Sequence, residues 1–597
     1  MASLRLLAPM IGFLSHAAAA AAATAGSAAA ATTATACASL SGRTFSNGTA
    51  NVTLATDMPQ GANLSTVGLA ADGPPTNELP GFCRVALSIQ TSPESAATAE
   101  VWLPQPDAWN ARLLTVGNGG FAGSINYADV AWGLRKGFAT TSTDTGHDTG
   151  HDPSSPGASW MLHYPERTID WAHRALHLSV VAAKQVVAAY YRDDNHTTQA
   201  AAESESPSHY SYYAGCSTGG RQGLAALQRY PADFDGVLVG SAIPWQTHTS
   251  AWQTYAALLQ YPASRSSFIP AGLWASLVAP AVLEQCDVAL DGVADGIIMD
   301  PSRCAFRPEI LLCGKTGGKT NTTVNTDCLT RDQVLNLKRL YRPWLTSDGQ
   351  LINPGISPGG ESGFASLMNS AEPLFGPEFY RNAVYNDSSW DWRTLSAADV
   401  AFADAVNPGG ANAYDPDLRP FEARGGKVLH YHGYADPLIP SLNAAAWYDE
   451  VNYFYESVVG RAGDVDRFYR LFMVPGMGHC SGGAGAWALD GAGQGGFPLS
   501  ANDSSHSLLY SLVDWVESAA GAATNISSAV NDPLKHPRRT TGNAPESIIG
   551  TKFVNDTPSL GVSFTRPICR WPQTAVYNGV GNVDDAASWS CPITGIY

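Results

Sequence analysis

The chain has 597 residues, of which 45% are hydrophobic and only 15% are charged, and it carries a formal net charge of −17. This length exceeds what one simple hydrophobic core holds, so we expect more than one structural region. The acidic balance argues against nucleic acid or an anionic membrane surface as a partner. The low fraction of charged residues fits a compact protein rather than a disordered one.

The N-terminus has the pattern of a secretory signal. Arg5 precedes an apolar run from Leu6 to Leu14, and an alanine-rich tract of small residues follows. We therefore expect a signal peptide over about residues 1–22 and a secreted, extracellular protein. We expect no later segment to be apolar enough to span a membrane.

The first element with chemical content is a predicted strand over Leu113–Val116, which runs into the sequence GNGG at 117–120. Enzymes that transfer acyl groups stabilise the oxyanion with backbone N–H groups, commonly with one from an early glycine-rich loop. We expect an amide near Gly120 to serve in this way. A flexible loop after a strand is the alternative, and the position of GNGG shortly before the next motif favours the functional interpretation.

Residues 215–219 read GCSTG and fit G-x-S-x-G, the sharp turn that presents a serine nucleophile above a sheet. The bare pattern also occurs by chance in glycine-rich chains. Here a predicted strand, 209–214, precedes it and a predicted helix, 221–231, follows it, as the motif requires. Ser217 is therefore the predicted nucleophile, and the N–H of Thr218 is the second predicted oxyanion donor.

Residues 246–419 differ in character from the sequence on either side. They carry four cysteines, many Trp and Pro residues and helical stretches such as Thr330–Trp344, without regular alternation of strands and helices. We interpret this segment as a lid domain inserted between two parts of a core domain, residues 37–245 and 420–597. No internal repeat is apparent.

Within the predicted lid, aspartates recur at short intervals in a glycine-punctuated loop, at Asp287, Asp291, Asp295 and Asp300. Carboxylate and carbonyl oxygens are the hard ligands that Ca²⁺ prefers, although the loop lacks the closing glutamate of an EF-hand. A series of turns built on Asp and Gly explains the same spacing. The residues alone leave both interpretations open.

Two later strands each lead to a candidate partner for Ser217. The predicted strand 427–432 ends in a turn with Asp436, and the predicted strand 468–474 ends in a Gly/Pro loop with His479. A serine hydroxyl needs a histidine to take its proton, and the histidine needs a carboxylate to orient it. The chain order Ser, Asp, His is that of the α/β-hydrolases.

These assignments have simpler alternatives. Asp436 precedes a proline, where aspartate is a common turn former, and His479 lies in a loop. His430 and His432 belong to the strand itself, so we expect them to be packed or hydrogen-bonded rather than catalytic.

The candidate nucleophile and the candidate base each have a cysteine as immediate neighbour, Cys216 and Cys480. If these two cysteines form a disulfide, their Cα atoms lie within roughly 4.4–6.8 Å. Ser217 and His479 would then share one small volume, and the covalent bond would assemble the site.

The segments GCSTGGRQGL, HGYADPLIP and PGMGHC together resemble the tannase and feruloyl esterase family of secreted serine esterases. The resemblance runs from about Cys37 to the C-terminus and includes GNGGFAG, STDTGHD and FDGVLVGSAIPW. It implies an α/β-hydrolase core with a large inserted lid domain, a Ser217, Asp436, His479 triad and a disulfide between the two neighbouring cysteines.

The resemblance also implies a calcium ion in the lid loop. Its ligands would be the side chains of three aspartates and two backbone carbonyls, at Asp287, Asp291, Val293, Asp295 and Ile297. The interval between the first two aspartates is one residue longer than in relatives.

Ten cysteines, an even number, suit an oxidising compartment. By proximity along the chain, we expect Cys286 to pair with Cys304, Cys313 with Cys328 and Cys569 with Cys591, which leaves Cys37 with Cys83. Sequence alone does not fix the connectivity. Nine N-x-S/T sequons beside a signal peptide predict a glycoprotein. The sequons are at Asn47, Asn51, Asn63, Asn195, Asn321, Asn386, Asn502, Asn525 and Asn555.

The activity implied by the resemblance is two-step ester hydrolysis through an acyl-enzyme. The sequence after the serine resembles the feruloyl esterase branch, so the expected substrate is a hydroxycinnamate ester, such as ferulate, on plant cell-wall sugar or a small alcohol. A tannase acting on gallate esters is one alternative. A catalytically silent binding protein on the same fold is another, and labelling by a fluorophosphonate would exclude it.

Overall fold

A computed structural model of the chain describes residues 36–62, 78–147, 157–191, 209–314, 328–367, 371–373, 375–495, 497, 503–521 and 544–592. The predicted signal peptide lies outside these residues. Five predicted sequons also lie outside them, at Asn63, Asn195, Asn321, Asn502 and Asn525. The other four are exposed, at Asn47, Asn51, Asn386 and Asn555.

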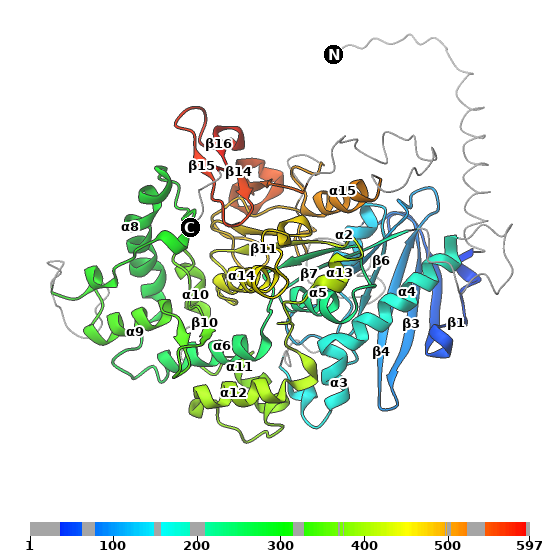
Figure 1. Ribbon diagram of the computed structural model, residues 1–597, viewed down its shortest axis with the longest axis horizontal. Helices are drawn as coiled ribbons and strands as arrows, with labels where there is room; N and C mark the ends of the chain where they lie inside the picture. The colour runs from blue at the N-terminus through cyan, green and yellow to red at the C-terminus, as the bar shows by residue number, and fades with distance from the viewer. Residues whose placement is uncertain are drawn as a thin grey trace, which may run out of the picture.

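A ten-stranded mixed sheet forms the centre of the molecule (Figure 1). In spatial order its strands are β1 (Thr44–Phe45), β2 (Ala50–Met58), β3 (Phe82–Ser92), β4 (Ser95–Pro104), β6 (Ala139–Thr143), β5 (Arg112–Val116), β7 (Tyr210–Cys216), β8 (Gly236–Gly240), β11 (Lys427–Gly433) and β12 (Tyr469–Val474). The first five strands pair antiparallel, and the six from β6 to β12 are parallel. The parallel strands are buried along almost their whole length, because helices cover both faces.

The parallel strands end together at one edge of the sheet. In their register, Val116 lies opposite Ala214, Cys216 opposite Gly240, and Gly433 opposite Val474. The glycine loop, the G-x-S-x-G turn and the loops after β11 and β12 therefore emerge at the same edge, where α/β proteins place their ligand sites. The strands predicted from sequence at 113–116, 209–214, 427–432 and 468–474 agree with β5, β7, β11 and β12 to within two residues.

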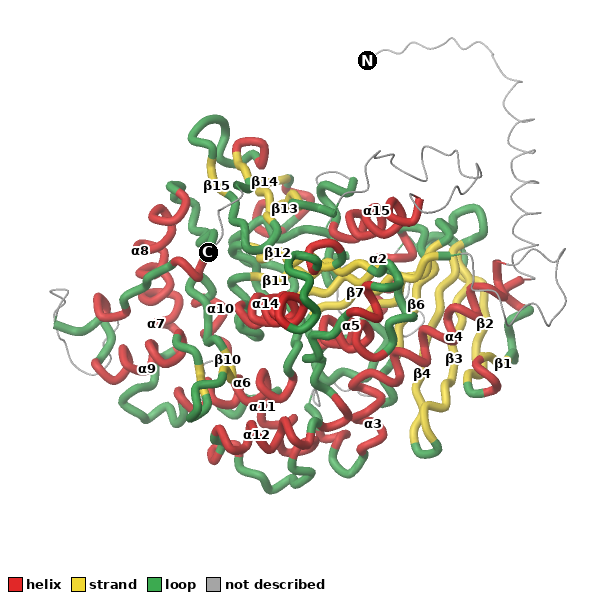
Figure 2. The backbone as a smooth tube through the Cα atoms, viewed as in Figure 1, coloured by secondary structure: helices red, strands yellow, loops and turns green. Residues whose placement is uncertain are grey.

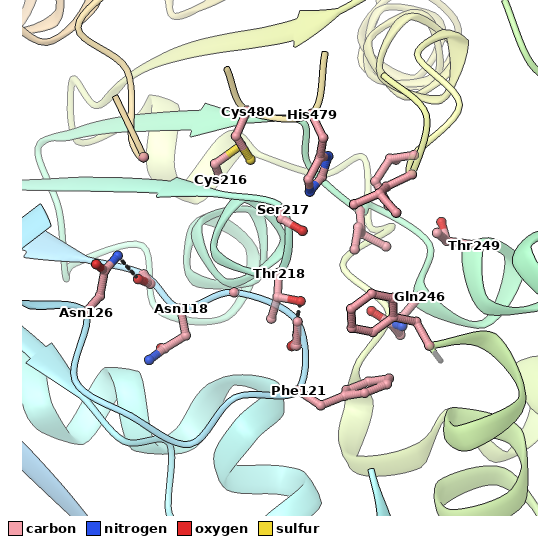
Figure 3. Close-up of a pocket in the computed structure, with 18 of the residues that line it drawn as sticks. Asn118, Phe121, Asn126, Cys216, Ser217, Thr218, Gln246, Thr249, His479 and Cys480 are labelled. Atoms are coloured by element: carbon pink, nitrogen blue, oxygen red, sulfur yellow. Dashed lines mark hydrogen bonds between the residues drawn. A yellow bond between two sulfur atoms is a disulfide. The ribbon is translucent and has the colours of Figure 1, made fainter. Parts of the chain in front are cut away.

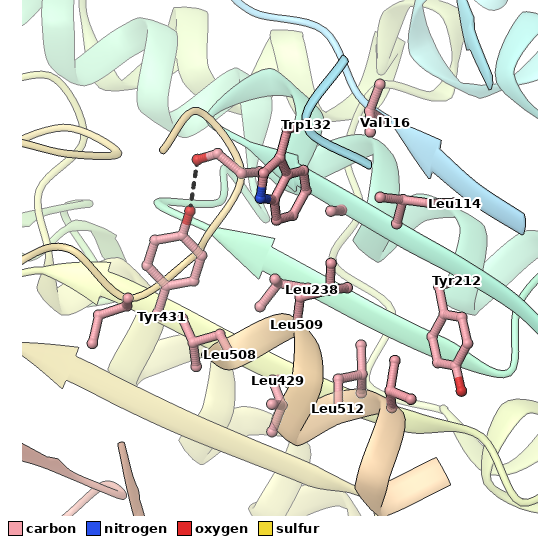
Figure 4. Packing of buried hydrophobic residues seen from close by; sticks show 14 of the residues in the cluster. Leu114, Val116, Trp132, Tyr212, Leu238, Leu429, Tyr431, Leu508, Leu509 and Leu512 are labelled. Atoms are coloured by element: carbon pink, nitrogen blue, oxygen red, sulfur yellow. Dashed lines mark hydrogen bonds between the residues drawn. The ribbon is translucent and has the colours of Figure 1, made fainter. Parts of the chain in front are cut away.

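Helices pack on both faces of the sheet (Figure 2). One face is covered by α2 (Tyr127–Arg135) and α15 (Leu508–Gly521), the other by α4 (Ala175–Tyr191), α5 (Thr218–Arg229) and α14 (Leu442–Ser457). Figure 4 shows Leu508 and Leu512 of α15 beside Leu238 and Leu429 of the central strands. All four leucines are fully buried, and each such side chain contributes about 1.5–3 kcal/mol of transfer free energy.

A helical region lies beside this core, within the segment predicted as a lid (Figure 1). It contains α6 (Gln246–Gln260), α7 (Ala271–Leu273), α8 (Ala279–Asp291), α9 (Arg331–Tyr341), α10 (Glu361–Leu367), α11 (Gly376–Phe379), α12 (Ala397–Val406) and the hairpin of β9 (Trp344–Leu345) and β10 (Leu351–Asn353). One hydrophobic cluster lies wholly between Trp252 and Phe364, so the region has a core of its own. A second cluster joins Phe121 and Trp171 of the core domain to Phe379 and Tyr380, and so docks this region on the sheet domain.

Two features of the lid differ from expectation. The aspartate-rich segment is not a loop throughout, because α8 continues to Asp291 and ends at Gly292, whose left-handed conformation (φ +81°) is a common helix terminus. The helical run Ala271–Asp291 is also long and apolar enough to cross a membrane by length and composition alone, contrary to our expectation of no such segment. In this fold Trp274 and Val282 of that run are buried in the lid cluster.

The C-terminal residues 544–592 form a separate layer rather than more of the central sheet. They contain β13 (Ser547–Phe553) paired with β14 (Val562–Cys569), and β15 (Val576–Tyr577) paired with β16 (Trp589–Ser590). A single bridge joins Phe472 of β12 to Arg570. The layer packs on the aspartate-rich lid segment, where Val293 and Ile297 share a cluster with Trp589. It therefore holds part of the lid against the core.

Candidate active site

The G-x-S-x-G segment forms a strained turn between β7 and α5. Ser217 has φ +62° and ψ −123°, a conformation that a side chain with a Cβ rarely adopts. Close backbone contacts make the turn possible: a Cβ at Gly220 would lie 2.6 Å from the carbonyl oxygen of Gly240. The turn leaves the Ser217 side chain partly exposed at the first residues of α5. This is the nucleophile position predicted from sequence.

Asp436 and His479 are brought together although they follow different strands. The Nδ1 atom of His479 lies 2.8 Å from Oδ2 of Asp436. Because a carboxylate only accepts, Nδ1 carries the hydrogen and Nε2 is left as a base. Figure 3 shows the imidazole of His479 directed at the hydroxyl of Ser217. The three residues have the arrangement of a serine, histidine and aspartate triad.

Asp436 is buried and held by donors on both of its oxygens. Oδ1 accepts from the amides of Leu438 at 2.8 Å and Ile439 at 3.0 Å. Burial alone would raise the pKa of Asp436, but the charge of His479 and the hydrogen bonds from His432 and His479 outweigh it and hold this pKa well below its ordinary value. The carboxylate is therefore ionised throughout the physiological range.

Cys216 and Cys480 form a disulfide with their Cα atoms 5.9 Å apart, across 264 residues of sequence. The bond joins the residue before Ser217 to the residue after His479. The remaining eight cysteines form the four pairs predicted by proximity along the chain. All ten cysteines are thus paired.

The glycine loop lies against the turn that carries Ser217. A Cβ at Gly117 would lie 2.7 Å from the Cα of Gly219, so only glycine permits this approach. The Thr218 hydroxyl donates to the carbonyl oxygen of Gly120 at 2.9 Å, and Gly120 has φ +54°. Thr218 opens α5, where backbone N–H groups have no acceptor within the helix. The two predicted oxyanion donors therefore come from adjoining segments.

Sequence reasoning missed Gln222 and Arg221, which hold these segments. The Gln222 side chain accepts from the Asn118 amide and donates to the Asn118 side chain, both at 3.1 Å. Arg221 is fully buried, lies 4.1 Å above the ring of Trp171 and donates to the carbonyl of Ala172. Burial lowers the pKa of Arg221 to about 9. The RQG sequence after the nucleophile was the available signal.

A cavity of about 360 Å³ opens beside Ser217 and His479, between the sheet edge and the lid. Its wall is largely apolar, with Phe121, Ile243, Phe375, Leu438 and Ile439. The volume and the apolar lining suit a small organic ligand.

Polar groups reach this cavity from α6. Gln246, Thr249 and Gln253 lie three and four residues apart and line the cavity together. The Gln246 side chain is 4% exposed and donates to the Ser250 hydroxyl at 2.9 Å, while its Oε1 atom is buried without a partner. A rotated amide would bond Ser250 equally well, so one polar group of Gln246 is unpaired in either orientation.

The aspartates predicted to bind calcium lie around the end of α8. Asp287, Asp291 and Asp295 each accept a backbone N–H, from Gly296, Val293 and Ile297 respectively. The second oxygen of Asp295 is 2.9 Å from the guanidinium of Arg566. The other oxygens, Oδ1 of Asp287 and Oδ2 of Asp291, are buried without a partner.

Burial raises the pKa of Asp291 to about 6, and it also raises the pKa of Asp287. Two orphaned, desolvated carboxylate oxygens are what a hard cation would satisfy. Within the part of the chain that the structure describes, no group of three or more His, Cys, Asp or Glu side chains is arranged to hold a metal ion by itself. A cation here would therefore need backbone carbonyls, as the resemblance implies for Val293 and Ile297.

Comparison with known proteins gives one consistent result. The model of the family described as tannase and feruloyl esterase matches residues 83–592. A probable feruloyl esterase B-1 of Aspergillus flavus is 34% identical over 539 residues, covering 89% of this chain and 91% of the relative. A probable feruloyl esterase B-2 of the same species is 36% identical over 520 residues, covering 86% and 88%.

Solved structures agree. The crystal structure of feruloyl esterase B from Aspergillus oryzae is 31% identical and has a TM-score of 0.78, covering 94% of this chain and 100% of that one. A tannin acyl hydrolase from Aspergillus niger, at 19% identity and a TM-score of 0.67, covers 94% of each chain and shares the fold.

Proposed function

The chain belongs to the tannase and feruloyl esterase family, and on that premise we propose that it is a secreted esterase that releases hydroxycinnamic acids, such as ferulic acid, from their esters. The α/β-hydrolase fold and the ester hydrolase activity are those of the family. The observation that carries the proposal is the convergence of Ser217, His479 and Asp436 beside an apolar cavity. Tannase activity on gallate esters is the weaker alternative, because feruloyl esterases are the more similar relatives.

The proposed reaction begins with acylation of Ser217. Nε2 of His479 takes the hydroxyl proton while Oγ attacks the ester carbonyl carbon. The resulting tetrahedral intermediate collapses, its bond to the alcohol oxygen breaks, and His479 gives its proton to the departing alcohol. Water then repeats the sequence on the acyl-enzyme, and the free acid leaves. Asp436 fixes the tautomer of His479 and stabilises the imidazolium in both steps.

The negative oxygen of each tetrahedral intermediate would be stabilised by the N–H of Thr218 and by an amide near Gly120. The contact between the Thr218 hydroxyl and the Gly120 carbonyl keeps these two segments at a fixed distance. Donors that are already in place cost no reorganisation when the charge develops, which makes this the largest electrostatic contribution in many such enzymes.

The acyl group would lie in the apolar cavity, with its ring between the aromatic and aliphatic wall and the polar face of α6. A hydroxycinnamate has a flat apolar body and a phenolic hydroxyl at its far end. The unpaired amide group of Gln246 supplies a partner for such a hydroxyl. The alcohol part, on a plant polysaccharide or a small alcohol, would leave towards solvent.

We also propose a structural calcium ion at the end of α8. Asp287, Asp291 and Asp295 would bind it through carboxylates, and Val293 and Ile297 through carbonyls. The two orphaned carboxylate oxygens support this proposal. The ion would cross-link α8 to the following loop and supply no chemistry to the ester.

Secretion and glycosylation belong to the same proposal. Five disulfides are consistent with an oxidising compartment. The signal-like sequence before residue 22 and four exposed sequons support export through the secretory pathway.

The substrate class is tested by comparing methyl ferulate, caffeate, p-coumarate and sinapate with methyl gallate and p-nitrophenyl butyrate. The vinyl spacer places the hydroxycinnamate ring about two bonds further from the carbonyl than the gallate ring, so one cavity cannot seat both rings equally well. Such misplacement costs about 1–3 kcal/mol, or roughly 10–200-fold in kcat/KM. We expect at least one hydroxycinnamate to exceed gallate by more than about tenfold. The reverse ranking would identify a tannase.

A further inference from the structure

The carboxylate of Asp436 contacts a second histidine, His432, besides His479. Nε2 of His432 lies 3.2 Å from Oδ2 of Asp436, the same oxygen that faces Nδ1 of His479 at 2.8 Å. His432 precedes Asp436 by four residues, near the end of β11, and its side chain is completely buried. The two histidines therefore approach one carboxylate oxygen from different segments of the chain.

The contacts of His432 show which of its ring nitrogens donates. Its Nε2 atom also lies 3.2 Å from the carbonyl oxygen of Ile439. Both neighbours of Nε2 only accept hydrogen bonds, so Nε2 carries the hydrogen. The Nδ1 atom is buried without a partner, and a proton there would leave a charged N–H unsatisfied. His432 therefore donates from Nε2.

We infer that His432 is a positioning residue of the catalytic site, which orients Asp436 and limits how strongly that carboxylate attracts a proton on His479. The inference rests on the proposed function only in that Ser217, His479 and Asp436 form the reacting triad. It goes beyond that function because His432 touches neither the cavity nor the nucleophile among the described contacts.

Two mechanical roles follow from the geometry. The imidazole of His432 contacts the carbonyl of Ile439, in the same turn whose amides donate to Oδ1 of Asp436. This contact stabilises the conformation of that turn. The contact with Oδ2 opposes rotation of the carboxylate away from His479. A hydrogen bond to a charged group in a buried site is stronger than one between neutral groups. Its loss also changes the hydrogen bonds that the charged group makes with its other partners.

An electrostatic role follows as well. Each donor on Oδ2 withdraws negative charge from that oxygen. Without the Nε2–H of His432, the carboxylate would attract the imidazolium form of His479 more strongly. His479 would then stay protonated, and inactive as a base, up to a higher pH. The acidic limb of the activity profile is thus expected to move upward in pH when this donor is removed.

The ionisable surroundings of Asp436 and His432 are few. His430 lies on the same strand with its ring centre 6.4 Å from that of His432, and it bonds the hydroxyl of Tyr469. Burial holds the pKa of His430 well below its ordinary value, so His430 is neutral. From the lid, the residues around α10 pack on the turn at Ala435, and the carboxylate of Glu361 there is held by Tyr341 and by the amide of Gly359.

His430 is a matched control. It lies two residues from His432 and is equally buried, and its described hydrogen bond is to Tyr469 rather than to Asp436. His430→Leu and His432→Leu therefore remove the same chemical group from the same strand. His432→Gln retains an amide N–H near the position of Nε2 and tests rescue.

The experiment measures the rate of Ser217 phosphonylation by a fluorophosphonate from pH 4 to pH 9, together with melting temperatures. This probe needs no particular acyl group, so failure to hydrolyse hydroxycinnamates would leave the result readable. We expect His432→Leu to lower the plateau rate by about tenfold or more and to raise the midpoint of the acidic limb by about half a pH unit or more. We expect His432→Gln to recover most of both effects.

We expect His430→Leu to keep the wild-type midpoint even if its melting temperature falls as far as that of His432→Leu. Equal midpoints for wild type, His430→Leu and His432→Leu would show that His432 only packs, and would overturn the inference. Failure of His432→Gln to move the midpoint back towards wild type would also contradict it. Absence of labelling in the wild-type protein would reject the triad and this inference together.

Discussion

Cys216 and Cys480 are 264 residues apart in sequence, yet their disulfide places the residue before the nucleophile next to the residue after the base. The two loops that meet here follow β7 and β12, which are separated in the sheet by β8 and β11. A hydrogen bond supports the same approach, since the Cys480 amide donates to the side-chain hydroxyl of Ser241 at 3.4 Å. The disulfide thus holds the loop of Ser217, the proton donor, close to the loop of His479, the proton acceptor.

Replacing both cysteines by alanine is predicted to lower kcat strongly while the folded structure, measured by circular dichroism, changes little. In the chain-entropy model the cross-link constrains the unfolded state by roughly 5 kcal/mol, which is an upper value. The stronger effect is expected on the approach of His479 to Ser217, where ~1 Å of misplacement costs about 100-fold. Kinetics and circular dichroism of the double variant test this. A variant with normal kcat, or with a collapsed spectrum that alone explains the loss, would contradict it.

Ser217→Ala and His479→Ala are each predicted to reduce ester turnover by at least ~10³-fold, because triad members act as a unit. Secretion and melting temperature should change little, since both side chains are partly exposed at the cavity. Steady-state assays on methyl ferulate and p-nitrophenyl butyrate measure the loss. Activity within about tenfold of wild type for either variant would reject the assignment.

Calcium is predicted to stabilise the lid without taking part in the chemistry. Chelation should lower the melting temperature, because the orphaned oxygens of Asp287 and Asp291 would again be buried without a partner. Asp291→Asn should weaken the response to added calcium. Elemental analysis of the purified protein and calorimetry with and without chelator measure both effects. Protein that contains no calcium and melts equally in chelator would remove the ion from the proposal.

Glu361 is predicted to make lid stability depend on pH. Burial raises the pKa of this carboxyl to about 7, although the hydroxyl of Tyr341 and the amide of Gly359 act in the opposite direction. The folded protein therefore binds a proton that the unfolded chain has released between about pH 4.5 and pH 7, so the free energy of unfolding falls as pH rises through this window. Glu361→Gln removes the titrating group while keeping the shape of the side chain.

The change in melting temperature caused by Glu361→Gln should accordingly be more favourable at pH 8 than at pH 5. Differential scanning calorimetry at the two values measures this. Glu456→Gln is a control for an exposed carboxyl, on α14. An equal effect of Glu361→Gln at both pH values would show that Glu361 does not titrate in this range.

Four strands of the central sheet were predicted from the sequence, and so were the three residues, Ser217, Asp436 and His479, that the structure brings together at their ends. Short apolar runs predict the strands, and the Gly, Pro or Asp residues that follow each run mark where the strand ends. The G-x-S-x-G pattern marks one of these ends. The adjacent cysteines then linked two loops that no local pattern connects. Apart from the disulfide, these patterns involve residues close together in the sequence, so they can be recognised without knowing the fold.

Other features depend on packing between distant segments, which local patterns do not encode. Gln246 and Thr249 look like any helix positions until α6 docks over the sheet edge. His432 looks like an ordinary buried strand residue in the sequence. Only the fold of the turn after β11 brings Asp436 into contact with the imidazole of His432. Asp287 and Asp291 were expected in a loop because Asp and Gly favour turns, whereas α8 continues to Asp291 and ends at Gly292.

Gln246 is predicted to set the preference for substrates with a phenolic hydroxyl. Its buried amide has one polar group without a partner, which a para hydroxyl on the ring would satisfy. The wild-type enzyme should therefore prefer methyl p-coumarate over methyl cinnamate, which lacks only that hydroxyl. Gln246→Leu removes the polar group and leaves an apolar side chain one atom shorter, so the preference should fall by about tenfold, or ~1.4 kcal/mol.

The ratio of kcat/KM for the two esters measures this preference within each variant, which cancels any general loss of activity. Gln228→Leu is the matched control, since Gln228 lies on α5 outside the cavity lining and bonds the carbonyl of Ala413. We expect its ratio to equal that of wild type. If Gln246→Leu retains the wild-type ratio, the phenolic hydroxyl is bound elsewhere. Thr249 and Gln253, on the same face of α6, would then be the next groups to replace.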